Sequence, residues 1–240
     1  MLYAASLPDN RVELTRMEPA INPHSLWLYA HILLLVYWLG ADLGVLLLAR
    51  AARRPELSFA ERAFALRMAM QIDFTPRICF ALMFPVGLQL VRSGGFAAVS
   101  DRLLVTSWIV AGAWIILLFA LARADGTRGV WLNRAHLALQ TVLLGGIGTL
   151  GLRSWWGLGP FPAGWLSTKV LLFALIFVAG IGIDFAFRPV TPAFIRLANE
   201  GSKPDIEKAI ATAVNTAICF VLGLYALLLL SAFLGTSKPF

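Results

Sequence analysis

Residues 26–49 read LWLYAHILLLVYWLGADLGVLLLA, and the only formally charged side chain among them is that of Asp42. A helix needs about 20 predominantly apolar residues to cross the hydrocarbon core of a bilayer, and this stretch is long enough to do so. Its length and composition therefore predict a transmembrane helix, and the rest of the chain has to be interpreted with a membrane in mind.

Further apolar stretches of similar length follow, at residues 72–91, 103–121, 131–151, 166–187 and 209–234. Of the 240 residues, 59% are hydrophobic and 14% are charged. A soluble domain has about 45–50% apolar and about 25% charged residues. We therefore predict an all-α polytopic membrane protein, a single six-helix transmembrane bundle over residues 26–234. An extracytoplasmic segment (1–25) precedes it and a short tail (235–240) follows.

The basic residues of the short loops predict the orientation of this bundle. The loops after the first, third and fifth spans contain Arg50, Arg53, Arg54, Arg62, Arg67, Arg123, Arg128, Arg134, Arg188, Arg196, Lys203 and Lys208. The opposite loops contain only Arg92, Arg102 and Arg153. Because Lys and Arg in short loops favour the cytoplasmic side, we expect both termini outside. The asymmetry also explains most of the net charge of +7, so the lipid bilayer is the expected partner and nucleic acid is not.

Local patterns predict where some helices begin and end. Ser58 and Glu61 have the spacing of a capping box, so an amphipathic cytoplasmic helix should start there, with its arginines free to face anionic lipid headgroups. Pro189 and Pro192 should close the fifth span, because proline is poorly tolerated inside a helix. Pro204 suits the first turn of the last helix.

Polar side chains also occur in the cytoplasmic halves of the spans, at Asp42, Asp73, Arg77, His136, Asp184 and Asn215. At about 1.5 Å per residue, Asp42, Arg77 and His136 lie at similar depths. Ionisable groups inside a membrane usually mark paired structural contacts or function. The set is thus either a neutralised network that ties helices together or a polar pocket for a proton or a substrate. We expect Asp42 to pair with Arg77.

A sparser polar set lies in the outer halves of the spans. His31 and Lys169 have similar depths, and Gln89 and Trp165 are close enough to join them. Alternatively, Lys169 extends to the headgroups, as lysines near helix ends do, and His31 hydrogen-bonds within the bundle. His31 and His136 fall in opposite halves of a hydrocarbon layer of about 30 Å, which disfavours one haem iron held by that pair.

Several classes of active site lack their usual motifs. Cys79 and Cys219 both lie in apolar runs, which indicates buried thiols rather than a disulfide or a cysteine-based metal site. The sequence contains no His-Glu-x-x-His, Walker-type loop or Gly-x-Ser-x-Gly. A metalloprotease, a nucleotide-driven pump and a serine hydrolase are therefore not expected.

Two short patterns carry a family resemblance. Residues 31–40 read HILLLVYWLG and residues 164–172 read GWLSTKVLL. These resemble the bacterial HemJ and copper-resistance-D (CopD) membrane proteins, in which a first-helix His is followed by Trp and Gly, and a later helix opens with Trp-x-x-x-Lys. The resemblance implies a bacterial inner membrane, so that the termini placed outside by the loop arginines would be periplasmic. It matches His31 to the family His and Lys169 to the family Lys, a pair associated in HemJ-type proteins with haem b and oxidation of protoporphyrinogen.

The chain departs from the HemJ pattern in two ways. HemJ-type proteins have fewer helices, whereas here two further spans separate the second helix from the one that carries Lys169. The His often found later on that helix is missing, and Asp184 lies near its place. These differences favour a CopD-like relative of unassigned activity over HemJ itself.

Three functions remain open at this point. The first is a haem-associated membrane redox protein in which His31 ligates the haem iron. Lys169 then acts as a catalytic residue that supplies an anion contact, a proton or a second ligand. The second is a CopD-like transporter of copper or a small solute, although the five Met and two Cys lack a repeated soft-ligand spacing. The third is a non-catalytic membrane subunit that works with a partner protein or as a homo-oligomer.

Overall fold

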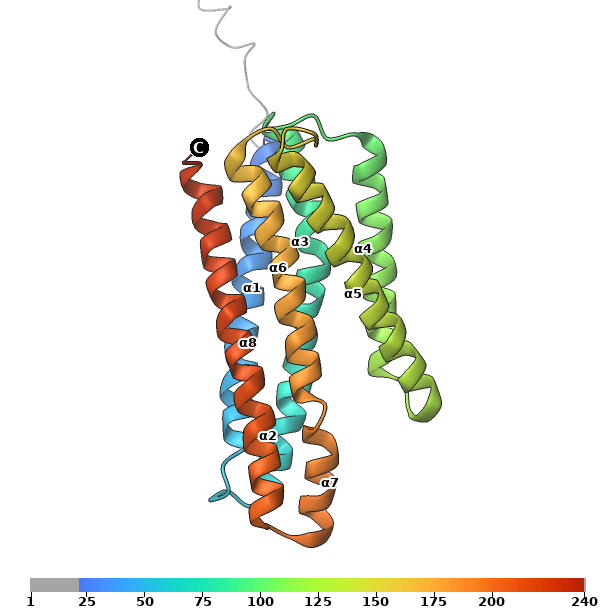
Figure 1. Cartoon of the computed structure of the whole chain (residues 1–240), viewed down its shortest axis with the longest axis vertical. Coiled ribbons are helices and arrows are strands. Elements are labelled where there is room, and N and C mark those ends of the chain that lie inside the picture. The colour runs from blue at the N-terminus through green and yellow to red at the C-terminus, as the bar shows by residue number, and fades with distance from the viewer. Residues whose placement is uncertain (1–21, 240) are drawn as a thin grey trace, which may run out of the picture.

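The computed structural model describes residues 22–239, which form helices and loops without any strand (Figure 1). The helices are α1 (Pro23–Ala52), α2 (Phe59–Ile72), α3 (Phe74–Ser93), α4 (Asp101–Ala122), α5 (Gly126–Trp155), α6 (Gly164–Phe187), α7 (Val190–Glu200) and α8 (Pro204–Ser237). In the view of Figure 1, α8 terminates at the upper end of the bundle, and α2 and α7 lie at the lower end.

Six helical stretches are long and apolar enough to cross a membrane: α1, α2 with α3, α4, α5, α6 with α7, and α8. The chain is thus a polytopic integral membrane protein, and the predicted all-α, six-span fold class is confirmed. The helices extend beyond the predicted spans: α1 begins at Pro23, and α8 runs to Ser237, into the predicted tail. Residues 1–21 of the predicted N-terminal segment lie outside the described residues.

The lower-end helix α2 begins as the sequence predicts. The Ser58 hydroxyl accepts from the backbone N–H of Glu61, and the Glu61 carboxylate accepts from the backbone N–H of Ser58. These two bonds satisfy amides that have no partner within the helix. The helix then continues almost directly into α3, with Asp73 at the junction.

The second lower-end helix, α7, is absent from the sequence prediction. Pro189 follows the end of α6, as expected, but Pro192 does not stop the chain from forming a helix again. It lies in the first turn of α7, where a missing N–H is tolerated. Pro204 likewise occupies the first turn of α8, as predicted.

Arg62 joins four elements at the lower end. Its guanidinium donates two hydrogen bonds of 2.8 Å to the Glu207 carboxylate on α8 and one of 2.8 Å to the backbone carbonyl of Ala52, at the end of α1. It also lies over the ring of Phe194 on α7, and its side chain is 2% exposed. The prediction that the α2 arginines are free to face lipid headgroups is therefore wrong for Arg62.

An aromatic layer crosses the middle of the bundle. Its members are Trp38 on α1, Phe80 on α3, Trp114 on α4 and Phe177 on α6, all buried. The ring centroid of Phe80 lies 4.4 to 5.2 Å from those of the other three. Below this layer are Asp42 and Arg77, and above it is a cavity that is described in the next subsection.

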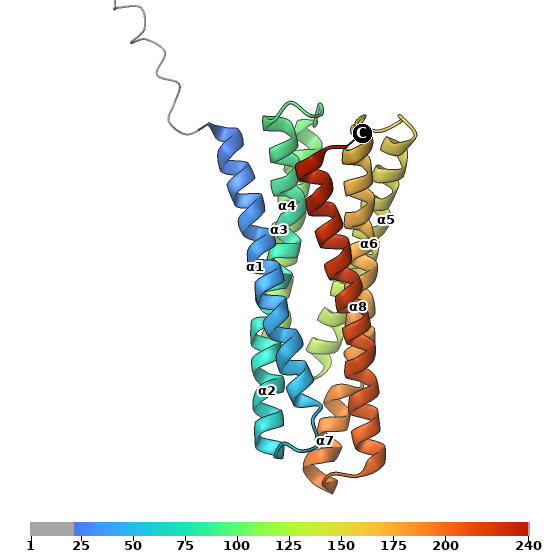
Figure 2. The same ribbon diagram turned by 90° about the vertical axis from the view of Figure 1, so that its left-hand side faces the viewer.

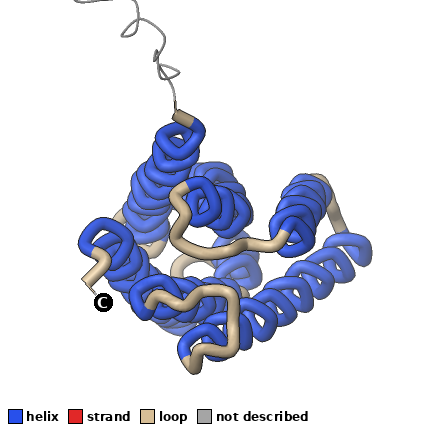
Figure 3. The backbone as a smooth tube through the Cα atoms, turned by 90° about the horizontal axis from the view of Figure 1, so that it is seen from above, coloured by secondary structure: helices blue, strands red, loops and turns tan. Residues whose placement is uncertain are grey.

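Two helices diverge toward the upper end. The helix α1 packs mainly on α3, and α8 packs mainly on α6, whereas α1 and α8 contact each other only lightly. Figures 2 and 3 show the separation between α1 and α8 at the upper end. At the lower end the same two helices are linked, because the Arg53 guanidinium donates to the Asn215 side-chain oxygen.

Candidate functional site

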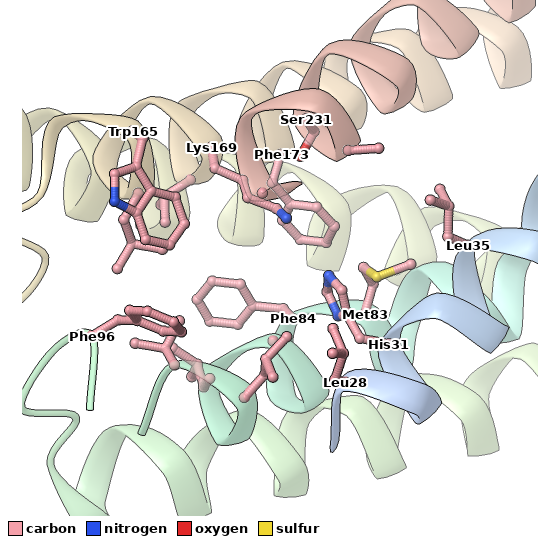
Figure 4. Close-up of a pocket in the computed structure, with 18 of the residues that line it drawn as sticks. Leu28, His31, Leu35, Met83, Phe84, Phe96, Trp165, Lys169, Phe173 and Ser231 are labelled. Carbon is pink, nitrogen blue, oxygen red and sulfur yellow. The ribbon is translucent and has the colours of Figure 1, made fainter. Parts of the chain in front are cut away.

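A cavity of about 490 Å³ lies in the upper half between α1, α3, α6 and α8. We call it the upper cavity. Its walls are mostly aliphatic and aromatic, and Figure 4 shows Phe84, Phe96 and Phe173 around it. The polar side chains that line it are His24, His31, Lys169, Ser231, Thr236 and Lys238.

His31 lines this cavity, and one nitrogen of its imidazole, Nδ1, is buried without a hydrogen-bond partner among the described residues. Gly87 on the facing helix α3 makes room for the ring: a Cβ at that position would lie 3.4 Å from the His31 Cε1. A buried polar nitrogen without a partner is costly, and Nδ1 lies on the side of the ring that faces Gly87. The imidazole is therefore not fixed by hydrogen bonds to the described residues, and it lines the cavity where a ligand could bind it.

Lys169 lies on α6, near the predicted depth, and its amine reaches α8. A Cβ at Gly235 would come within 2.5 Å of the Lys169 Nζ, so the absence of a side chain there leaves space for the ammonium. Figure 4 shows the amine and the His31 imidazole pointing toward one another across the cavity. The fold thus brings His31 and Lys169, far apart in sequence, into one site.

The upper rim of the cavity is aromatic and cationic. The Phe96 ring packs edge-on against Trp165, with centroids 5.6 Å apart. The Lys238 Nζ lies 4.3 Å from the Phe96 centroid and 5.9 Å from that of Trp165, within cation–π range. His24 Nδ1 lies 3.2 Å from the Ser93 hydroxyl, so it already has a partner.

The rim differs from the sequence prediction. Trp165 lines the cavity as expected, but Gln89 does not. Phe96 and Lys238 were missed because they lie in a loop and at the end of the last helix, where the sequence carries no periodic signal. Lys238 adopts a left-handed backbone conformation (φ 44°) where it caps α8. This local feature sets where the helix ends, but it is visible only in the structure and could not have been predicted from the sequence.

The lower polar cluster is paired internally. The Arg77 guanidinium binds Asp73, at the junction of α2 and α3, at 2.6 Å and Asp184 on α6 at 3.0 Å. The Gln140 amide donates to Asp184 at 3.4 Å and lies 3.0 Å from a ring nitrogen of His136. These contacts connect α3, α5 and α6, which favours the structural interpretation of the network.

The prediction that Asp42 pairs with Arg77 is wrong. Arg77 is occupied by Asp73 and Asp184, and Asp42 forms no ion pair or hydrogen bond with any described residue, although it is only 7% exposed. Counting residues along the helices places Asp42 and Arg77 at the same depth. An ion pair also requires that each helix be rotated so that the two side chains face each other, and residue counting does not predict that rotation. Asn215 also stays apart from the cluster, since it is exposed and accepts from Arg53.

The two polar regions are separate sites. Along α1, Trp38 lies between His31 and Asp42, and along α6, Phe177 lies between Lys169 and Asp184, so the aromatic layer divides them. The upper region combines unpaired polar groups with room for a ligand. Within residues 22–239 no group of three His, Cys, Asp or Glu side chains is placed to hold a metal ion.

Chemically, the upper cavity offers an imidazole nitrogen, two ammonium groups and an apolar body. This combination suits a ligand that is flat or flexible, mostly apolar, and either metal-bearing or anionic.

Comparison with known proteins assigns no family or function to the chain, because no protein-family model, curated protein or solved structure matches it.

Proposed function

We propose that the chain is a haem-associated membrane redox protein in which His31 ligates the iron of a haem b in the upper cavity. The observation that carries this proposal is the His31 imidazole, which lines a cavity of about 490 Å³ and whose buried Nδ1 has no partner among the described residues. Neutral imidazole is a common axial ligand of haem iron. The resemblance of residues 31–40 and 164–172 to HemJ and CopD proteins supports the same pair of residues.

The remaining lining residues fit this group. The cavity volume falls within the range of about 300–1,000 Å³ that is usual for small-molecule sites. Aromatic and aliphatic walls suit the macrocycle, and Lys169 and Lys238 suit its carboxylates. When bound, haem supplies a one-electron redox centre.

The chain's own residues have distinct roles in this proposal. His31 would hold the iron, and Gly87 on α3 leaves room for its imidazole ring. Lys169 is the proposed catalytic residue: its Nζ faces the cavity and can hold a proton or bind an anionic group of a substrate. His24 is a poorer ligand than His31, because its Nδ1 is already next to the Ser93 hydroxyl.

The other two functions receive less support. A copper path needs several soft ligands, but Met83 is the one sulfur-bearing side chain on the upper cavity. Cys79 is buried as predicted, whereas the prediction of a buried thiol is wrong for Cys219, which is exposed on α8. A non-catalytic subunit does not require an open cavity with an unpaired imidazole. The experiment that follows also tests the transporter and the non-catalytic subunit.

The proposal is tested by a reduced-minus-oxidised optical spectrum of the protein purified from membranes in mild detergent. We expect the sharp absorption bands of a b-type haem, at a stoichiometry near one per chain. A protein that carries no haem, even after haemin is supplied during expression, would overturn the proposal. Copper in place of haem, measured by elemental analysis, would favour the transporter instead.

We also propose that the lower end faces the cytoplasm of a bacterial inner membrane and that both termini are periplasmic. The support is the concentration of arginines and lysines at that end, including Arg54, Arg67 and Lys208. Alkaline phosphatase and green fluorescent protein fused after residue 202, between α7 and α8, provide the test. We expect fluorescence and no phosphatase activity, and the reverse result would invert the orientation.

A further inference from the structure

The upper cavity is open toward the side of the bundle. Two of its α1 residues, Leu28 and Ile32, are 42% and 48% exposed although they line the cavity. Across from them, Thr236 and Lys238 of the α8 end are also exposed and line it. Because α1 and α8 diverge at this end, as Figure 2 shows, the side opening faces the surface that the bilayer covers.

The charges around this opening are of one sign. Lys169 and Lys238 both line the cavity, and no Asp or Glu does. Neither ammonium forms an ion pair with any described residue, in contrast to Lys203, which binds Glu200 at 2.9 Å. The ammonium of Lys238 is supported by aromatic rings rather than by a carboxylate. The cavity therefore has an electrostatic preference for an anion at its upper rim.

We propose that the upper cavity takes amphiphilic anions from the bilayer through the opening between α1 and α8, with the anionic group bound by Lys238 and Lys169. The apolar body of the ligand lies against the aliphatic and aromatic walls below the rim. This inference rests on the proposed function, because haem binding and anion binding are both assigned to the upper cavity. Haem, an apolar macrocycle with carboxylates at one edge, belongs to the same class.

Lys238 is the specificity residue of this site. Its side chain lies over Phe96 and Trp165, so its ammonium is already positioned at the rim. Lys169 reaches the same space from α6, against Gly235. An ester of the same ligand fills the cavity equally well but loses attraction to both ammonium groups, so charge and shape can be tested separately.

The test uses 9,10-dibromostearate, whose bromine atoms quench tryptophan fluorescence on contact, and its uncharged methyl ester. Titrations are made on the full-length His31→Ala variant in neutral detergent micelles, so that no iron ligand is involved. Trp165 lines the cavity, and a Trp165→Phe variant identifies its share of the signal. We expect saturable quenching of Trp165 by the acid and weaker quenching by the ester.

Charge recognition is tested by Lys238→Met, which keeps the apolar stem. We expect the acid to bind about fivefold more weakly, as for an exposed ion pair of about 1 kcal/mol, while ester binding is unchanged. Lys208→Met is the matched control, because Lys208 is an exposed lysine at the other end of the same helix. Equal binding of acid and ester, or no effect of Lys238→Met, would overturn the inference.

A second arm distinguishes the source of the anion. Brominated phosphatidylglycerol and brominated phosphatidylcholine replace the fatty acid in nanodiscs. Quenching of Trp165 by the anionic lipid alone, reduced by Lys238→Met, assigns the site to lipid headgroups. Quenching by the free acid alone assigns it to a free amphiphile, and equal quenching by both lipids overturns the inference. A haem-free protein that passes these tests refutes only the proposed function.

Discussion

His31→Ala is expected to abolish the haem spectrum of the purified protein while the chain still inserts into the membrane. Alanine has no nitrogen lone pair for the iron, and the other nitrogen donors of the cavity are less suited. The ring is half-buried beside open space rather than packed in the core, so the loss of packing is small. The measurement is the haem content per chain, with insertion checked by extraction from washed membranes.

The three histidines of the described chain provide matched controls. His24→Ala and His136→Ala should retain haem, since His24 lies next to Ser93 and His136 lies beyond the aromatic layer, next to Gln140. A His31→Gly variant supplied with free imidazole should regain part of the spectrum, because imidazole can enter the space that the side chain leaves. Haem that survives His31→Ala but is lost in His136→Ala would move the site to the lower cluster.

Arg62→Met is expected to lower the free energy of unfolding by about 3–5 kcal/mol, the usual cost of removing one partner of a buried ion pair. The substitution leaves the Glu207 carboxylate, 17% exposed, without its guanidinium partner. It also removes the donor to the Ala52 carbonyl, one of the free carbonyls at the end of α1. The measurement is unfolding in mixed micelles with increasing sodium dodecyl sulfate.

Arg196→Met is the matched control for charge removal at the same end. Arg196 pairs with Glu200 and Asp205 but is 48% exposed, so its loss should cost less than about 1 kcal/mol. The double variant Arg62→Met/Glu207→Met should be more stable than Arg62→Met alone, because no unpaired charge remains. Equal losses for Arg62→Met and Arg196→Met would show that burial adds nothing to this contact.

The fold was predictable because the membrane makes apolar length the dominant signal. Stretches such as 26–49 and 209–234 must be helical, since a bilayer offers no partner for free backbone groups. The helix α7 was missed for a related reason: it lies beside α2 and α8 at the lower end, and tertiary packing of Val190 and Phe194 stabilises it. Its length alone gives little signal, and two prolines next to its start suggested a loop.

The candidate site was only partly predictable, because depth and rotation are independent. Counting residues along each helix gave His31 and Lys169 the same depth, and they line one cavity. The same counting placed Asp42 beside Arg77. In the structure, Asp42 lies on the buried α1 face that includes Trp38, and no described cation lies within ion-pair distance of it. The contribution of Lys238 depends on where α8 ends relative to Phe96, a long-range relation that local patterns do not encode.

The aromatic layer formed by Trp38, Phe80, Trp114 and Phe177 separates the two polar regions by a level of apolar rings. Neighbouring ring centroids lie 4.4 to 5.7 Å apart in tilted, edge-on and stacked arrangements, and the Trp114 indole nitrogen has no hydrogen-bond partner among the described residues. A proton that moved from the lower cluster to the upper cavity would have to cross this stack without a chain of hydrogen bonds. We therefore expect the layer to keep the charged groups of the lower cluster electrically separate from those of the upper cavity.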